Sequence, residues 1–148
     1  MTKIKKQSSA WMVAQSYLAR REYSRKELSE KLTSREFAAN EIERVLDELV
    51  KRGWQSDQRY CESFVRFRVM KGQGPRKIQY ELQQKGVNSE IITSVLQLYD
   101  AQWLQLCENV LTKKYATTEP LSLDEKAKRY RFLNTRGFPA DIIRQVMG

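Results

Sequence analysis

The sequence predicts an all-α protein in which a three-helix module occurs three times in tandem, about nine helices in all. Three observations lead to this fold class. Proline and glycine are scarce, at three and six of 148 residues, and they lie between periodic apolar segments rather than inside them. Capping signals mark several helix starts. Apolar residues also come into register when the chain is shifted along itself, as expected of a repeat protein.

The first module is expected in residues 1–54, with a basic N-terminal arm. Its second helix is predicted to begin at Ser24-Arg-Lys-Glu27. This is a capping box, in which the Ser24 hydroxyl accepts from the Glu27 amide and the Glu27 carboxylate reaches back. Asn40 precedes the next amphipathic stretch and is predicted to cap the third helix.

The second module is expected in residues 55–99. An amphipathic stretch from Asp57 to Met70 predicts its first helix. Gly74-Pro75 predicts the start of the next helix, because proline at the first helical position loses no hydrogen bond. The first helix is predicted to present one apolar arc, made by Tyr60, Cys61, Phe64, Val65 and Phe67.

The third module is expected in residues 100–148. Its first helix is predicted around five apolar residues, Trp103, Leu106, Cys107, Val110 and Leu111. A loop near 117–120 separates this helix from Ser122-Leu-Asp-Glu125, which predicts a second capping box and another helix start.

The three copies align without gaps at offsets of 50 and 101 residues. Each aligned position is apolar in all copies: Leu32, Leu82 and Leu133; Phe37, Val87 and Phe138; Ile42, Ile92 and Ile143; Val45, Val95 and Val146; Leu46, Leu96 and Met147. Gly86 and Gly137 also match each other, with Glu36 in the first copy. A unit of about 50 residues buries little surface alone. We therefore expect neighbouring modules to stack into an elongated, curved array.

Composition argues against several kinds of chemistry. The chain has no histidine, which removes histidine-based triads and the usual general base near neutral pH. Cys61 and Cys107 form no CxxC metal motif, and we expect both thiols to lie in the core of a cytosolic protein. We therefore expect neither an enzyme nor a cofactor.

The net charge is +9, from 27 Lys and Arg against 18 Asp and Glu. Such an excess favours binding to nucleic acid or to an acidic protein surface. No apolar stretch approaches the ~20 residues that span a bilayer, and the basic start lacks the apolar core of a secretory signal. We expect a monomer in the cytoplasm without membrane contact.

Basic residues concentrate in the second module. The candidate contacts for a partner are Arg59, Arg66, Arg68, Lys71, Arg76, Lys77 and Lys85. Arg59 and Arg66 are predicted to project away from the apolar arc, whereas Arg68 and Lys71 continue it near the helix end. The alternative is that these side chains are only solvated helix surface, as most charged helical residues are.

Other functional interpretations are weaker. Lys71-Gly-Gln-Gly-Pro-Arg-Lys77 lacks the GxxxxGK[ST] pattern and a preceding strand, so a glycine-built joint between helices is preferred to a phosphate loop. The third helices begin with acidic or neutral residues, such as Glu41 and Asp141, which disfavours sequence-specific DNA reading by a helix-turn-helix. Trp54 and Trp103 are candidates for stacking on bases, but both are expected in the core.

Two blocks of the sequence resemble the RecX family of bacterial regulators. One is Tyr17-Leu-Ala-Arg-Arg-Glu-Tyr-Ser-Arg-Lys-Glu-Leu28. The other runs from Gly53-Trp-Gln-Ser-Asp57 through Arg59-Tyr60 to Lys71-Gly-Gln-Gly-Pro-Arg-Lys-Ile78 and Glu81-Leu-Gln-Gln-Lys-Gly86. The third copy matches as well at Arg136-Gly-Phe138, so the resemblance covers nearly the whole chain.

The resemblance implies a tandem of three-helix modules and a non-enzymatic role in DNA repair and recombination. Members of the family bind the RecA recombinase, usually as its filament on single-stranded DNA, and restrain its recombinase, ATPase and coprotease activities. The family offers no catalytic residues and no contact motif to carry over. The alternative is a non-specific DNA-binding or architectural protein that reaches RecA only through shared single- or double-stranded DNA.

Overall fold

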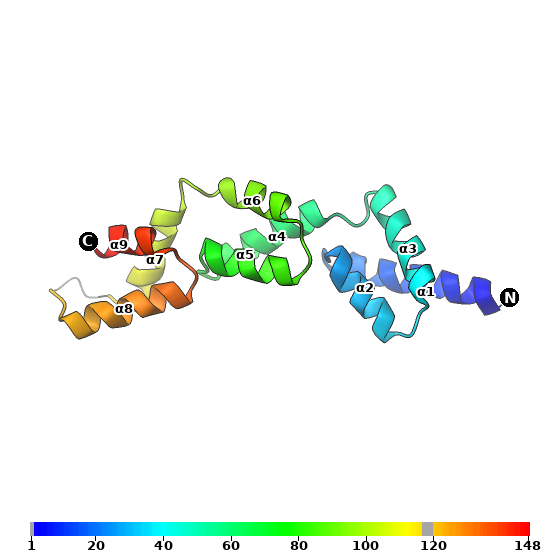
Figure 1. The fold of residues 1–148 in the computed structure, drawn as a ribbon, viewed down its shortest axis with the longest axis horizontal. Coiled ribbons are helices and arrows are strands. Elements are labelled where there is room, and N and C mark those ends of the chain that lie inside the picture. Colours follow the sequence, from blue (N-terminus) through cyan, green and yellow to red (C-terminus); the bar gives the residue numbers. More distant parts are fainter. Residues whose placement is uncertain (1, 117–119) are drawn as a thin grey trace. The chain divides into compact units, whose positions relative to one another are not determined.

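The computed structural model describes residues 2–116 and 120–148, and all regular elements in these ranges are α-helices (Figure 1). The helices of the described residues are α1 (Thr2–Arg20), α2 (Arg25–Ser34), α3 (Ala39–Lys51), α4 (Asp57–Met70), α5 (Pro75–Gln84), α6 (Ser89–Gln97), α7 (Trp103–Lys114), α8 (Leu123–Thr135) and α9 (Ala140–Met147). The predicted all-α class and the nine helices are confirmed for this part of the chain. Residue 1 of the predicted arm and residues 117–119 of the predicted loop lie outside it.

The helices follow one another as three groups of three. In the first and third groups, each helix packs on both others of its group. The chain divides into two compact units, residues 1–63 with 83–91 and residues 64–82 with 92–148. Helices α4, α5 and α6 each contribute residues to both units. The module boundaries at 54/55 and 99/100, and the curved stacking of modules, stay predictions.

Each unit has its own apolar core. In the first unit the core is formed by α1, α2 and α3, with fully buried side chains that include Ala14, Leu28, Leu32, Leu46 and Leu49. In the second unit the fully buried side chains include Val65, Ile78, Leu82, Leu133, Phe138 and Ile143. Burial of these side chains is the main source of stability, since each Leu or Ile contributes roughly 1.5–3 kcal/mol.

The predicted capping box is complete at Ser24, whereas at Ser122 only the serine half of the predicted box is present. At α2 the Glu27 amide donates to the Ser24 hydroxyl, and the Ser24 amide donates to Glu27 Oε1, both at 3.1 Å. At α8 the Glu125 amide donates to the Ser122 hydroxyl at 3.1 Å. These bonds satisfy amides that have no partner within the helix.

One cap prediction was wrong. The N-cap of α3 is Ala38, which has extended backbone (φ −69°, ψ 144°), and Asn40 lies inside the first turn. The Asn40 side-chain oxygen accepts from the Glu41 amide at 3.0 Å instead. The helix therefore begins at Ala39, before the asparagine that was predicted to cap it.

Burial of the aromatic residues follows the prediction only in part. Trp103 is 4% exposed, as expected for the core. Phe67, at the edge of the apolar arc, is 55% exposed, and Lys71 Nζ lies 5.1 Å from its ring centroid. Trp54 is 43% exposed and packs on Trp11, with 5.5 Å between ring centroids. It follows the end of α3, so helical periodicity does not govern its burial.

The predicted register of the three copies is confirmed by burial. Leu32, Leu82 and Leu133, which occupy the same position, are all fully buried. The shared turn after the second helix has positive φ in every copy, at Glu36, Gly86 and Gly137. The shift between copies therefore matches a repeated backbone conformation as well as a repeated core.

Both cysteines are free and fully buried, as predicted. Burial raises the pKa of Cys107 to about 11. Burial likewise raises the pKa of Cys61 to about 11, with smaller contributions from the negative charges of Glu62 and Asp57. The two thiols behave as small apolar core groups.

Candidate protein and nucleic-acid interface

The seven basic residues singled out by the sequence divide between the two compact units. Arg59 and Lys85 belong to the first unit. The second unit holds Arg66, Arg68, Lys71, Arg76 and Lys77. They differ in whether their charged groups already pair with other groups of the protein.

In the first unit both basic side chains have internal partners. Arg59 Nε lies 3.0 Å from Glu22 Oε2, and Arg59 Nη2 donates to the Trp54 carbonyl at 3.1 Å. Lys85 Nζ lies 3.4 Å from Glu27 Oε2, on the carboxylate that completes the capping box. Exposed pairs of this kind contribute only about 0–1 kcal/mol, but they leave less charge for a partner.

Arg68 is the most internally engaged basic residue of the second unit. Its Nη1 lies 2.9 Å from Glu81 Oε2 on α5 and 3.5 Å from Gln73 Oε1. Its guanidinium carbon also lies 4.6 Å from the Phe64 ring centroid. Arg68 therefore joins α4 to α5, and its charge is balanced within the unit.

Three basic side chains of the second unit are more accessible. Arg66, Lys71 and Arg76 are exposed, and none of them takes part in the ion pairs found among the described residues. Lys71 Nζ lies 5.1 Å from the centroid of the exposed Phe67 ring. Lys77 is partly buried at the start of α5. Arg66, Lys71 and Arg76 are the cations of the candidate set best placed to meet phosphate or carboxylate.

The segment 71–77 forms a joint between α4 and α5, as the sequence predicts, and it docks on the end of α8. The Gly74 amide donates to the Arg136 carbonyl at 2.7 Å, and the Arg76 amide donates to the Gly137 carbonyl at 2.9 Å. A phosphate loop needs such amides free to donate to an anion. Because these two amides already donate to carbonyls, the geometry favours a structural joint.

Glycine is required in this joint because two backbones approach closely. A Cβ on Gly74 would lie 2.6 Å from the Gly137 carbonyl carbon, and a Cβ on Gly137 would lie 2.4 Å from Lys77 Cβ. The first unit repeats the contact, since a Cβ on Gly86 would lie 2.8 Å from Lys26 Cβ. In both units, the first turn of one module's second helix packs on the turn glycine of the next module.

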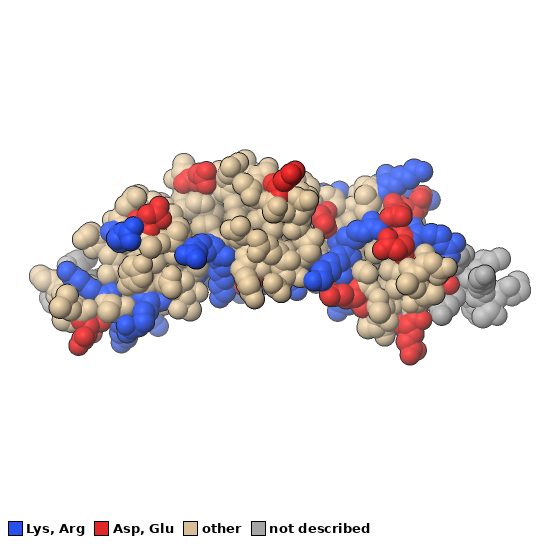
Figure 2. Space-filling view, viewed as in Figure 1, with Lys and Arg blue, Asp and Glu red and all other residues tan. Residues whose placement is uncertain are grey.

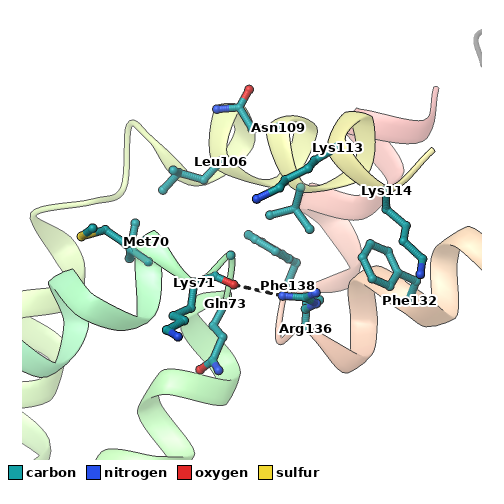
Figure 3. Close-up of a pocket in the computed structure, with 13 residues that line it drawn as sticks. Met70, Lys71, Gln73, Leu106, Asn109, Lys113, Lys114, Phe132, Arg136 and Phe138 are labelled. Atoms are coloured by element: carbon teal, nitrogen blue, oxygen red, sulfur yellow. Dashed lines mark hydrogen bonds between the residues drawn. The ribbon is translucent and has the colours of Figure 1, made fainter. Parts of the chain in front are cut away.

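A cavity of about 720 Å³ lies in the second unit between the end of α4, α7 and α8 (Figure 3). Its cationic lining residues are Lys71, Lys113, Lys114 and Arg136. Sequence reasoning identified only Lys71 as a contact. Lys113 and Lys114 are visible in the sequence as a basic pair at a helix end, but only the packing of α7 against the joint brings them to the same cavity.

An aromatic and cationic cluster lies on the first unit at the end of α3. The Arg52 guanidinium carbon lies 5.0 Å from the Trp11 ring and 5.4 Å from the Trp54 ring. Trp54 remains partly exposed beside it. Stacking of this ring on a nucleic-acid base stays a prediction.

Acidic and basic side chains are interspersed over α2 and α3 on the face shown in Figure 2. Between these two helices, Arg25 Nη2 lies 2.9 Å from Glu43 Oε2 and 2.7 Å from Asp47 Oδ1. Among the residues described, no group of three or more His, Cys, Asp or Glu side chains is placed to hold a metal ion. Within the same ranges, no helix has both the length and the apolarity needed to cross a membrane.

Three family models match successive parts of the chain. They describe the first three-helix domain of RecX at residues 10–49, the second at 56–96 and the third at 100–147. The chain is 39% identical over 129 residues to the regulatory protein RecX of Legionella pneumophila (strain Corby), covering 87% of this chain and 86% of that protein. It is 37% identical over 132 residues to the regulatory protein RecX of Actinobacillus pleuropneumoniae serotype 5b (strain L20), covering 88% and 85%. The crystal structure of RecX from Lactobacillus salivarius matches with a TM-score of 0.84 at 26% identity, covering 97% of this chain and 96% of that chain.

Proposed function

Because the chain belongs to the RecX family of regulatory proteins, we propose that it binds the RecA recombinase, chiefly as its filament on single-stranded DNA. In this proposal it restrains the recombinase, ATPase and coprotease activities of the filament. The observation that carries the proposal is the succession of all three RecX domains along one chain. Such a regulator acts by binding rather than by catalysis, as a monomer, in the cytoplasm where RecA meets DNA.

The accessible cations of the second unit form the proposed contact surface. Arg66, Lys71 and Arg76 have no ion-pair partner among the described residues and are exposed on or beside two neighbouring helices. Charges of this kind speed encounter with an acidic surface and set the register of the complex more than they raise its final affinity. Arg68 is paired with Glu81 and Lys77 is partly buried, so both add less accessible charge to this surface.

The second candidate function is non-specific DNA binding, and the net charge of +9 favours it. A protein of that kind would reach RecA only through the DNA that both bind. Its affinity for bare DNA would fall steeply with salt, because each phosphate contact releases counterions.

Fluorescence anisotropy separates the two candidates. The labelled protein is titrated, at one physiological salt concentration, with RecA filament held on single-stranded DNA by a non-hydrolysable ATP analogue, and separately with the same DNA bare. We expect much tighter binding to the filament. Equal affinity for the filament and for bare DNA would mean that the basic side chains bind DNA phosphates, and it would overturn the proposed recognition of RecA.

A charge-reversal pair then tests the surface. We expect Arg66→Glu combined with Arg76→Glu to weaken filament binding by about tenfold or more, since each reversal replaces an attraction with a repulsion. The control pair, Lys126→Glu with Lys128→Glu, makes the same change in net charge on exposed positions of α8. Equal losses in both pairs, with unchanged circular dichroism, would show that the effect is one of total charge.

A further inference from the structure

We propose that the cavity between α7, α8 and the end of α4 docks an extended acidic peptide segment of a partner protein, which places one bulky apolar side chain among the cations. This inference goes beyond the proposed function, because it depends only on the second unit and names a different surface. Lys71 borders both surfaces, so the tests below alter α7 instead.

The size and floor of the cavity suit an apolar side chain. Its volume of about 720 Å³ lies within the usual range of ligand pockets, about 300–1,000 Å³. The fully buried Phe138 forms part of its wall, and Leu106 and Val110 contribute partly exposed apolar surface. Met70 lines the cavity and is 80% exposed. A flexible, exposed methionine is typical of surfaces that adapt to an apolar partner.

The charges around the cavity all have one sign. Lys71, Lys113, Lys114 and Arg136 line it, and none of the described lining residues is acidic. None of these four cations enters an ion pair with another described residue. In Figure 3 the side chains of Lys113 and Lys114 extend from α7 on one side of the cavity, while those of Lys71 and Arg136 lie on the other side. Carboxylates between these sides would relieve the repulsion among like charges.

Arg136 is already held in place for such a role. Its Nη1 donates to the Lys71 carbonyl at 3.0 Å (dashed in Figure 3), which leaves other guanidinium donors for a ligand. The Lys113 ammonium has no partner among the described residues. A cation held by a bond to its own protein loses less side-chain entropy when a ligand binds.

The same contacts favour a peptide over nucleic acid. Single-stranded nucleic acid binds by stacking bases on exposed aromatic faces. Here the centroid of the Phe132 ring lies 5.2 Å from the Arg136 guanidinium carbon, 5.8 Å from Lys114 Nζ and 5.7 Å from the centroid of the Tyr115 ring. Phe138 is fully buried. An acidic peptide with an apolar anchor matches both the charges and the apolar wall, whereas a phosphate backbone matches only the charges.

The probe is a fluorescein-labelled peptide with one phenylalanine between two short runs of aspartate, titrated with the full chain by anisotropy at physiological salt. We expect Lys113→Glu with Lys114→Glu to weaken binding by about tenfold or more. The matched control, Lys126→Glu with Lys128→Glu, should change it little. Replacing the phenylalanine of the peptide by serine should also cost about tenfold, because an apolar side chain is no longer buried.

A double variant with neutral side chains controls for loss of the helix. Lys113→Gln with Lys114→Gln keeps helix propensity and should give a smaller loss in the same direction. The proposal is overturned if the control pair loses as much as the α7 pair, or if the serine peptide binds as well as the phenylalanine peptide. If single-stranded DNA binds more tightly than the phenylalanine peptide, and Lys113→Glu with Lys114→Glu removes that binding, the cavity is a nucleic-acid surface instead. No result with the peptide bears on binding of the RecA filament, so the two proposals fail separately.

Discussion

At the scale of single residues, one turn position shows where glycine is needed and where it is not. Glu36, Gly86 and Gly137 occupy equivalent positions, with φ of 67°, 79° and 101°. Lys26 approaches Gly86 and Lys77 approaches Gly137, closely enough to exclude a Cβ, whereas Glu36 is exposed. The first module can therefore keep a side chain here, at the cost of an unfavourable backbone conformation.

Replacing Glu36 by glycine should therefore stabilise the protein. The left-handed conformation costs a non-glycine residue of order 1–3 kcal/mol, and the greater freedom of glycine in the unfolded chain offsets about 0.4–1 kcal/mol of the gain. We expect Glu36→Gly to raise the free energy of unfolding by about 0.5–1 kcal/mol, measured by guanidinium denaturation. Glu36→Gln removes the charge but keeps the Cβ, so an equal gain in that variant would assign the effect to charge instead.

At the scale of helices, the sequence predicts what depends on neighbours along the chain. The capping box at Ser24 and the buried register of Leu32 and Leu82 follow from spacings of a few residues or from exact repetition. The pairing of Arg68 with Glu81 and the approach of Lys113 to the cavity depend on how helices pack. Periodicity gives the face of a helix but not its neighbour, so the candidate site was predicted only in part.

The joint between α5 and the end of α8 tests this packing directly. In Gly137→Ala the new Cβ would meet Lys77 Cβ at 2.4 Å and Lys77 N at 2.7 Å, at a φ of 101°. We expect a loss of about 2–4 kcal/mol in the free energy of unfolding, from overpacking and backbone strain together. The matched control is Gly53→Ala, where φ is 74° and the Cβ meets nothing within 4 Å. It should cost only about 1 kcal/mol, and an equal loss at both glycines would refute the close approach.

At the scale of the whole molecule, α4, α5 and α6 each run through residues of both compact units. Unfolding of either unit would therefore interrupt three helices that the other unit shares. Cys61 lies in the first unit and Cys107 in the second, and both are fully buried. Each thiol is thus a probe of its own unit, and its ionisation is coupled to unfolding.

The free energy of unfolding should fall as the pH rises from about 8.5 toward 11. Burial raises the pKa of both thiols to about 11 in the folded protein, whereas an unfolded thiol titrates near 8.5. The unfolded state therefore loses its thiol protons first, so their contribution is complete below pH 8 and is lost across this window. From pH 8 to 10 we expect each thiol to account for a loss of about 1–2 kcal/mol in the free energy of unfolding.

Guanidinium denaturation of Cys61→Ala, Cys107→Ala and the double variant isolates each thiol from the other alkaline groups. If the helices couple the units, both single variants keep one transition and each recovers about half of the loss. Two separate transitions, or a pH dependence unchanged in the double variant, would contradict the coupling or the burial of the thiols, respectively.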